Sequence, residues 1–155
     1  LNHERVTICS SGIIERQLED VTRWAKQTTR PGGGRVIDEP RVRQLLARVH
    51  ARLEFLRLVN FKVAWAAEQG QPLDPAMAST VKVFGTEFYM EAVRLLMEVV
   101  GPASSLRGTS PDAVLRGRLN GLLRGLHVLS FGGGTNEMQR DLIALFGLNM
   151  PPSPR

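Results

Sequence analysis

The sequence predicts an all-α fold, an antiparallel four-helix-type bundle of three long helices plus two shorter C-terminal helices. No segment alternates apolar and polar residues with the period of two that a half-buried strand shows. Apolar residues instead recur every three or four positions, which is typical of a helix with one buried face. Short proline- and glycine-rich breaks separate these stretches, so consecutive long helices must lie antiparallel.

The first helix is predicted over residues 1–29, where no proline occurs. The segment 30–34, Arg-Pro-Gly-Gly-Gly, ends this helix and forms a mobile loop, because proline cannot continue the hydrogen-bond ladder and glycine favours irregular backbone. The apolar residues of the helix recur on one stripe, at Val6, Ile13, Ile14, Leu18, Val21 and Trp24.

The second helix is predicted to begin at Asp38, a favourable N-cap, with Glu39 and Pro40 in its first turn. A carboxylate suits the helix dipole there, and the missing N–H of proline costs nothing. Gly70 is expected to end the helix as a C-terminal cap. The predicted core face consists of Val42, Leu45, Leu46, Val49, Leu53, Leu56, Val59 and Val63.

The third helix is predicted from the N-cap Asp74 to about Val100, where Gly101 and the proline after it stop the helical pattern. A shorter helix is expected over residues 113–129. We assign residues 1–150 to a single domain and residues 151–155 to an extended tail.

The glycine run 132–134 breaks the fourth helix, and Thr135 is placed to cap the last one. Free N–H groups beside flexible backbone suit a phosphate or another oxyanion, although plain helix-to-helix turns use glycine equally often. On these residues alone, the two interpretations are even. The apolar side of the last helix is predicted to carry Met138, Leu142, Ile143, Leu145 and Phe146.

The composition narrows the class of protein. The chain has 155 residues and is 43% hydrophobic, and 20 Lys and Arg against 15 Asp and Glu give a net charge of +5. A single cysteine excludes a disulfide-built scaffold and a cysteine-based zinc module. No apolar run is long enough for a membrane span and no targeting pattern occurs, so we expect a cytoplasmic protein. The first residue is not Met, so the chain is either processed or a fragment.

Two other kinds of site are disfavoured. The histidines at positions 3, 50 and 127 share no metal-ligand spacing with one another or with Cys9, so no metal site is predicted. Cys9 is expected in the middle of the first helix as a buried structural thiol. Arg41, Arg48 and Arg52 share one helix face, but exposed aromatic residues are too few for a nucleic-acid surface. A solvated face or a subunit contact is the better interpretation.

Two segments carry a family resemblance. The sequence Phe-Gly-Gly-Gly-Thr-Asn-Glu-Met-Gln-Arg-Asp-Leu-Ile-Ala at 131–144 closely resembles the C-terminal signature of acyl-CoA dehydrogenases. Residues 1–6, Leu-Asn-His-Glu-Arg-Val, are similar to the Leu-Asp-x-Glu-Arg start of the C-terminal α-domain in the isovaleryl and long-chain branches. The resemblance covers essentially the whole chain, but only the last part of a family protein.

The resemblance implies a reaction. Family members use a glutamate to remove an α-proton from an acyl-CoA thioester while the β-hydride passes to FAD, leaving a trans-2-enoyl-CoA. In most branches that glutamate precedes the Gly-Thr of the signature, where this chain has Gly133. In the isovaleryl and long-chain branches it lies on the first helix, at the position of Glu4. The resemblance therefore implies Glu4 as the base, with the Gly133 N–H polarising the thioester carbonyl.

Further site residues follow from the resemblance. Arg5 and Gly134 match positions on the substrate side, whereas Thr135 and Glu137 match positions that contact the flavin. Each has a structural alternative, since a helix-surface ion pair would account for Arg5 and helix capping for Thr135 and Glu137. Glu4 could likewise be a solvated carboxylate near a helix start.

Two family motifs that reach a neighbouring subunit's flavin are altered. Arg30 lies in Thr-Thr-Arg-Pro-Gly where the family has Arg-x-x-Phe-Gly, so it would need a shifted register to reach the flavin. Gly101 lies in Glu-Val-Val-Gly-Pro where the family has Gln-x-x-Gly-Gly-x-Gly, and the carboxylate of Glu98 would repel a pyrophosphate. Such asymmetry resembles the α2β2 heterotetramers of actinobacterial steroid side-chain and ring breakdown.

Three functions stay open at this point. The first is a flavin-dependent acyl-CoA dehydrogenase that passes electrons to an electron-transferring flavoprotein, as a homo- or heterotetramer. The second is a non-catalytic partner subunit of such an enzyme, in which Glu4 is incidental. The third is a stand-alone helical binding module, whose association with nucleic acid would be salt-sensitive. Acyl-chain specificity does not follow from the sequence.

Overall fold

The computed structural model describes residues 2–152, and it describes side chains from residue 4 onward. Within those residues every regular element is helical, apart from one isolated β-bridge between Thr29 and Arg35. The all-α prediction is therefore confirmed. Leu1 and residues 153–155 of the expected tail lie outside the described part of the chain.

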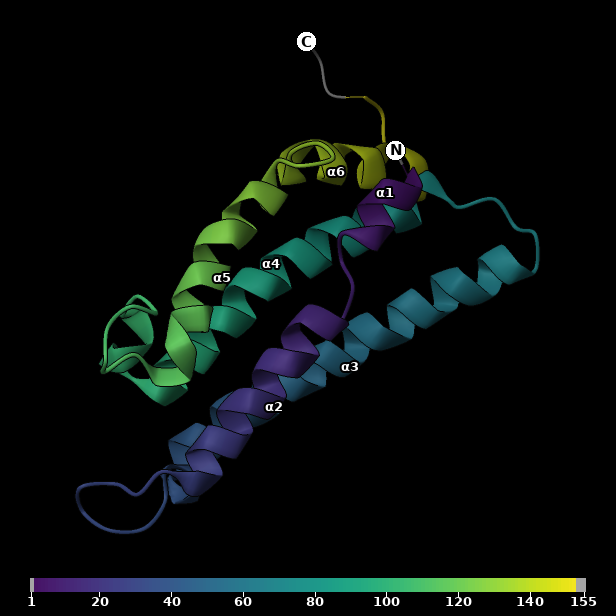
Figure 1. Ribbon diagram of the computed structural model, residues 1–155. Helices are drawn as coiled ribbons and strands as arrows, with labels where there is room; N and C mark the ends of the chain where they lie inside the picture. The colour runs from purple at the N-terminus through teal and green to yellow at the C-terminus, as the bar shows by residue number, and fades with distance from the viewer. Residues whose placement is uncertain (1, 153–155) are drawn as a thin grey trace.

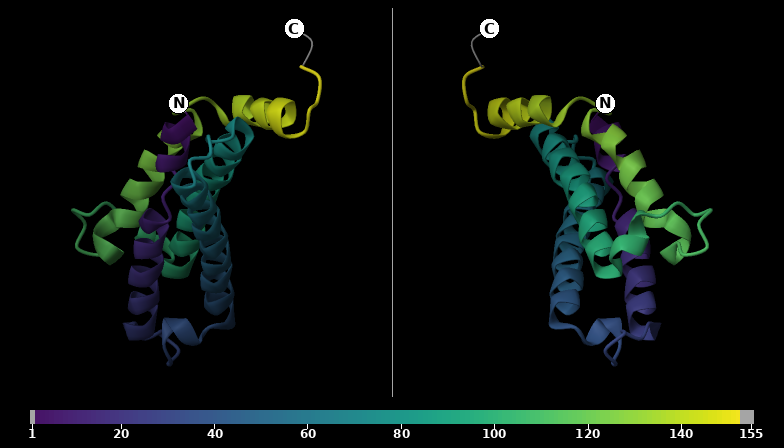
Figure 2. Two further views of the ribbon diagram at one scale, coloured as in Figure 1. Left: turned by 90° about the vertical axis from the view of Figure 1, so that its right-hand side faces the viewer. Right: turned by 90° about the vertical axis from the view of Figure 1, so that its left-hand side faces the viewer.

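The central element is α4, which contacts all five other α-helices. Figure 1 shows α2 and α3 antiparallel to each other, α4 returning beside α3, and α5 running back along α4. Both α1 and α6 lie where α4 begins, and the α2–α3 loop lies at the opposite end (Figures 1 and 2). The helices are α1 (Asn2–Thr7), α2 (Gly12–Gln27), α3 (Pro40–Glu68), α4 (Pro75–Val100), α5 (Arg118–Leu126) and α6 (Asn136–Leu142).

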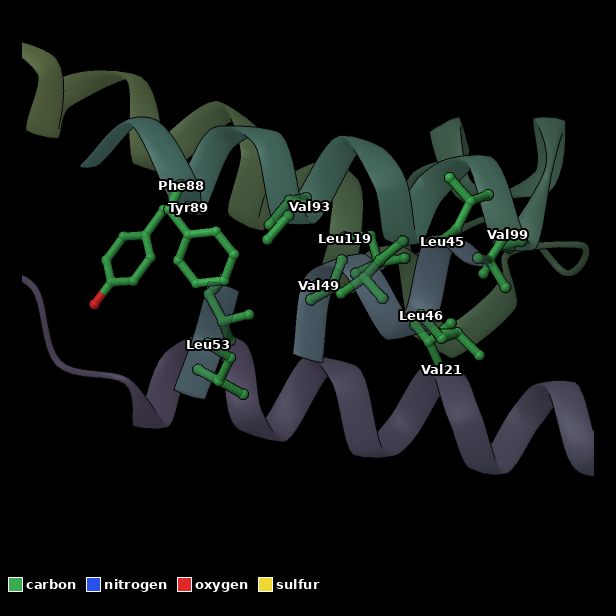
Figure 3. Close-up of a cluster of buried hydrophobic side chains, with 14 of the residues drawn as sticks. Val21, Leu45, Leu46, Val49, Leu53, Phe88, Tyr89, Val93, Val99 and Leu119 are labelled. Atoms are coloured by element: carbon green, nitrogen blue, oxygen red, sulfur yellow. The ribbon is translucent and has the colours of Figure 1, made fainter. Parts of the chain in front are cut away.

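Short helical turns fill the connections between the α-helices. They span Val36–Asp38, Pro102–Ser105, Val114–Gly117 and His127–Ser130, with a wider π-helical turn at Ile143–Gly147. The hydrophobic core lies between α2, α3, α4 and α5 (Figure 3). Burying a large apolar side chain stabilises the fold by roughly 1.5–3 kcal/mol. The side chains labelled in Figure 3 are Val21, Leu45, Leu46, Val49, Leu53, Phe88, Tyr89, Val93, Val99 and Leu119.

Both ends of α4 and the C-terminal end of α3 form as the sequence predicts. The Asp74 carboxylate accepts the N–H groups of Ala76 and Met77, both at 3.1 Å, which caps α4. Gly101 closes α4 with a φ of 81°, and its N–H donates to Met97 at 2.8 Å. Gly70 has a φ of 70° just after α3, as a C-terminal glycine requires.

The prediction of one continuous first helix is wrong, because α1 ends at Thr7 and α2 begins at Gly12. In the break, the carbonyl of Cys9 accepts a hydrogen bond from Asn60 at 3.1 Å, and that of Ser10 accepts one from the Tyr89 hydroxyl. A continuous helix would use those carbonyls for its own N–H groups. Cys9 is therefore in a linker, not mid-helix, although it is fully buried as predicted.

Two other predicted boundaries are wrong. Glu39, not Asp38, caps α3, since Asp38 ends a short helical turn and accepts the Arg35 N–H at 2.8 Å. The helix predicted over 113–129 is also divided, because Leu115 and Arg116 have φ values of 51° and 55°. Only residues 118–126 of that stretch form a regular α-helix.

The predicted apolar faces hold for α3 and fail for α6. Of the predicted core residues of α3, the six from Val42 to Leu56 are buried, while Val59 and Val63 are only half-buried. In α6 the predicted apolar side is largely exposed, with Met138 at 56%, and the polar Asn136 and Gln139 are buried instead. The same is true just beyond α6, where Phe146 is 54% exposed.

Three of the arginines of α3, those expected to share one face, bind carboxylates of α4 within the same chain. Arg41 pairs with Glu98 at 2.9 Å, and both Arg48 and Arg52 pair with Glu91 at 2.5 Å. The arginine side chains stay exposed, at 63%, 61% and 36%, so the expected solvated face is present and carries intramolecular ion pairs. Of the helices in the described residues, none has both the length and the apolar character to cross a bilayer.

Candidate functional site

The glycine-rich loop 130–135 and α1 meet at the end of the molecule where α4 begins, although they come from opposite ends of the sequence (Figure 1). The Arg5 side chain donates from Nε to the Gly133 carbonyl oxygen at 3.3 Å. A Cβ added at Gly133 would lie 3.7 Å from Arg5 Cγ and 4.0 Å from Ile8 Cδ1. A side chain at position 133 would therefore extend toward Arg5 of α1, which follows Glu4 in the sequence.

Glu4 lies in the first turn of α1, and its side chain is exposed in this chain. Its backbone carbonyl accepts the Ile8 N–H at 3.1 Å and the Thr7 hydroxyl at 2.9 Å, which closes the short helix. The structure thus brings Arg5 to the glycine loop, and Glu4 precedes Arg5 in α1. The side chains of the two preceding motif residues are not among those described.

The loop needs glycine at two successive positions. Gly133 and Gly134 have φ values of 72° and 100°, in the region that side chains other than glycine rarely adopt. The Gln139 side chain donates to the Gly133 carbonyl at 3.2 Å. A Cβ at Gly134 would lie 2.7 Å from Gln139 Nε2, so the end of that side chain would have to move, but the φ of 100° is what requires glycine there.

A buried lysine holds both sides of this loop. The Lys82 side chain lies on α4 with no exposed surface. Its Nζ donates to the Ser130 carbonyl at 3.1 Å, to the Gly134 carbonyl at 2.7 Å and to Asn136 Oδ1 at 2.5 Å. Burial lowers the pKa of Lys82 below its usual value, because a charged group loses its hydration there.

Further polar contacts join α4 to α6. Asn136 Nδ2 donates to Thr86 Oγ1 at 3.1 Å, and the Thr86 hydroxyl donates to the Lys82 carbonyl at 2.9 Å. One turn along α6, Arg140 forms an ion pair with Glu87 at 2.6 Å. The contact between these helices is therefore made by directional hydrogen bonds at its centre.

Thr135 caps α6 as predicted, since its hydroxyl accepts the Met138 N–H at 3.3 Å. Glu137 is exposed, and two hydrogen bonds to its carboxylate lower its pKa. One comes from the backbone N–H of Glu137 itself and the other from the Thr135 hydroxyl. The backbone N–H groups of Gly133 and Thr135 have no hydrogen-bond partner among residues 2–152. Two donors at the loop are thus available to an oxygen acceptor.

Arg30 and Gly101 are not part of this constellation within one chain. Arg30 lies in the α2–α3 loop and pairs with Glu39 at 2.8 Å, and Gly101 ends α4 (Figure 1). Both lie at the opposite end from the glycine loop. In the described residues, no cluster of three His, Cys, Asp or Glu side chains could hold a metal ion.

Sequence reasoning missed Lys82 and Gln139. A signal for Lys82 was present, because it lies between Ala78 and Thr86 on the same stripe of α4, where a lysine interrupts a small-residue face. Gln139 lies within the signature at 131–144, but nothing in that pattern indicated that its side chain is buried and bonded to the Gly133 carbonyl.

Comparison with known proteins identifies relatives. Residues 1–147 match the family "Acyl-CoA dehydrogenase, C-terminal domain". The acyl-CoA dehydrogenase FadE26 of Mycobacterium tuberculosis is 49% identical over 159 residues, which cover 100% of this chain and 39% of that protein. FadE29 of the same organism is 36% identical over 157 residues, again covering 100% of this chain and 39% of the relative. The chain therefore spans about two fifths of their length.

Solved structures agree with this assignment. The ChsE4-ChsE5 complex from Mycobacterium tuberculosis superposes with a TM-score of 0.86 at 49% identity, over 93% of this chain and 37% of the other. The Tcur3481-Tcur3483 steroid ACAD superposes with a TM-score of 0.88 at 42% identity, over 99% of this chain and 38% of the other. The chain belongs to the acyl-CoA dehydrogenase family and corresponds to the C-terminal helical domain of its members.

Proposed function

We propose that the protein containing this domain is an FAD-dependent acyl-CoA dehydrogenase, which forms a trans α,β-double bond in an acyl-CoA thioester. Glu4 would take the α-proton, and FAD would supply the acceptor for the β-hydride. The observation that carries the proposal is the contact between α1 and the glycine loop, made by Arg5 and the Gly133 carbonyl at 3.3 Å. This contact supports a site shared by α1, which carries the proposed base, and the loop from the other end of the chain.

The geometry at Gly133 explains how a base on α1 can replace one on the loop. A side chain at 133 would project toward Arg5 and Ile8, and the nearness of these two residues to Glu4 in the sequence supports a base on α1 in place of one on the loop. Only one carboxylate is needed there, because two would repel each other in an enclosed site. With glycine at 133, the backbone N–H keeps its capacity to donate to the thioester oxygen.

The residues around the loop suit the flavin and the thioester. The N–H groups of Gly133 and Thr135 are unpaired in the described residues, and both cofactor and substrate offer oxygen acceptors. Thr135 and Glu137 would contact the flavin and Gly134 the substrate. An apolar cavity of about 390 Å³ lies beside α1, between α3 and α4, and its lining includes Val6, Val63 and Met77. Entry of an apolar acyl group into such a cavity would be favourable, because its apolar surface leaves water.

A steroid CoA ester, from the side chain or the rings, is the substrate class that the relatives favour. One solved relative is described as a steroid ACAD with two named components, and the ChsE4-ChsE5 relative is likewise a complex of two named proteins. We infer an α2β2 assembly that passes electrons to an electron-transferring flavoprotein. In support, Arg30 and Glu98 are already engaged by Glu39 and Arg41, so neither is poised for a neighbour's flavin.

The test uses the full-length protein with its native partner. We expect one FAD per copy of this chain after denaturation, none on the partner, and bleaching of the flavin band by a steroid CoA thioester such as cholanoyl-CoA. A homotetramer with four flavins would contradict the asymmetric assembly. An intact chain without flavin would instead indicate a non-catalytic partner subunit.

A further inference from the structure

The glycine loop is fixed from behind by a single buried ammonium group. Lys82 donates to the Ser130 carbonyl before the glycine run and to the Gly134 carbonyl within it. Its third acceptor is Asn136 Oδ1, after the run. We propose that Lys82 is a positioning residue, which polarises the Thr135 backbone N–H and directs it at the bound flavin. This inference rests on the proposed function.

Peptide planarity gives the direction of that N–H. The carbonyl of Gly134 and the N–H of Thr135 belong to one trans peptide, so they point in opposite directions. Because the Gly134 carbonyl points at Lys82 Nζ, 2.7 Å away, the Thr135 N–H points away from the lysine. It has no acceptor among the described residues, so it is a donor held in place but not consumed by the fold.

An ammonium group suits this position better than a neutral side chain. It offers three donors and no acceptor, and all three meet oxygen atoms here. A positive charge at a carbonyl oxygen also strengthens donation from the N–H of the same peptide, because hydrogen bonds in a chain polarise one another. Lys82 thus acts through the backbone without touching the ligand.

The positive charge remains directed at the loop. Among the ion pairs of the described residues, none involves Lys82, and the nearby Glu87 is instead paired with Arg140 at 2.6 Å. Asn136 is held in turn by Thr86 at 3.1 Å. A carboxylate bound directly to Lys82 would have cancelled the polarisation of the Gly134 peptide.

The experiment compares Lys82→Met with wild-type full-length protein in its native complex. Lysine and methionine have similar lengths, but the substitution removes the charge and all three donors. We expect FAD affinity to fall by roughly tenfold or more, the size expected for losing hydrogen bonds to a charged group. Amide hydrogen exchange of peptides covering residues 130–137 should accelerate by a similar factor, while peptides of α2 and α3 exchange as in wild type.

Tyr89→Phe is the matched control, because it removes another buried hydrogen bond of α4, to the Ser10 carbonyl instead of the loop. It should leave loop exchange and FAD affinity unchanged. If Lys82→Met fails to fold, Asn136→Ala removes one of the three acceptors and should produce the same two changes at a few-fold size.

The outcomes separate the two levels of the proposal. A Lys82→Met protein that loses stability but keeps wild-type loop exchange and FAD affinity would overturn the positioning role. Faster loop exchange together with weaker FAD binding supports it. Wild-type complex that binds no FAD would overturn the proposed function itself, and with it the ligand of the Thr135 N–H.

Discussion

The two ends of α4 are held by different interactions. Toward its C-terminal end, Val93 is fully buried against apolar side chains of the neighbouring helices (Figure 3), and so is Leu96. Toward its N-terminal end, the buried residues Lys82 and Thr86 meet the polar side chain of Asn136 through hydrogen bonds. Apolar side chains such as Phe131, 60% exposed, lie on the outside there.

The difference separates stability from positioning. Apolar packing is non-directional and scales with the area removed from water, so it stabilises the helices without fixing any single donor. Hydrogen bonds to a buried charge are directional and specify one arrangement of the loop, at the cost of desolvating the charge. We therefore expect substitutions in the packed end to change stability, and substitutions in the polar end to change ligand binding.

The largest expected stability effect is that of Phe88→Ala in the packed region. Phe88 is 1% exposed, and its ring stacks on Phe84 with the centroids 5.8 Å apart. Truncating a buried phenylalanine typically costs about 3–5 kcal/mol. Urea unfolding of the full-length complex should show this loss, with the FAD affinity of the folded fraction unchanged. A loss below about 1 kcal/mol would contradict the assignment of this region as the source of stability.

The packed region is also the one that the sequence predicts well. Helical spacing identifies Val42, Leu45 and Leu46 as core, because apolar periodicity and burial have the same physical cause. The polar end could not be derived in that way. The break after α1 depends on Asn60 and Tyr89, which are distant in sequence, and no local pattern reveals such donors. The inverted faces of α6 have the same cause, since Asn136 is buried by its partners on α4.

A smaller stability effect with a larger functional consequence is expected for Gly134→Ala. The added Cβ would lie 2.7 Å from Gln139 Nε2, so the Gln139 side chain must move away from the loop, and alanine would be strained at a φ of 100°. Backbone strain of this kind costs roughly 1–3 kcal/mol. Isothermal titration with FAD should show weaker binding than in wild type.

Gly121→Ala is the matched control for that substitution. Nothing lies within 4 Å of a Cβ at Gly121, which is in the middle of α5 and has a helical backbone. Alanine there should leave FAD binding unchanged and stabilise the fold by about 0.5–1 kcal/mol. If Gly134→Ala and Gly121→Ala changed FAD binding equally, the proposed role of the polar end of α4 in ligand binding would be contradicted.

The smallest effect at neutral pH concerns Cys9, in the linker that contacts α4, because its contribution to stability changes only at alkaline pH. Burial raises the pKa of the Cys9 thiol from 9.0 to about 12. The unfolded thiol ionises above pH 9.0 while the folded one stays neutral, so this contribution to stability is present below pH 9.0 and is lost as pH rises toward 12. The unfolding free energy of wild type should fall by up to about 1.4 kcal/mol per pH unit relative to Cys9→Ala. Parallel pH profiles would show that the thiol is not buried.

The most direct test of the account is the rate of flavin reduction in Glu4→Gln. Measured by stopped flow on the native complex with cholanoyl-CoA, that rate should fall by roughly 10²–10⁴-fold, the usual contribution of a general base. FAD content and unfolding should stay as in wild type, because Glu4 is exposed in this domain. Glu19→Gln, an equally exposed carboxylate on α2, should reduce flavin at the wild-type rate. An unchanged rate in Glu4→Gln would contradict the central claim that α1 and the glycine loop form the active site.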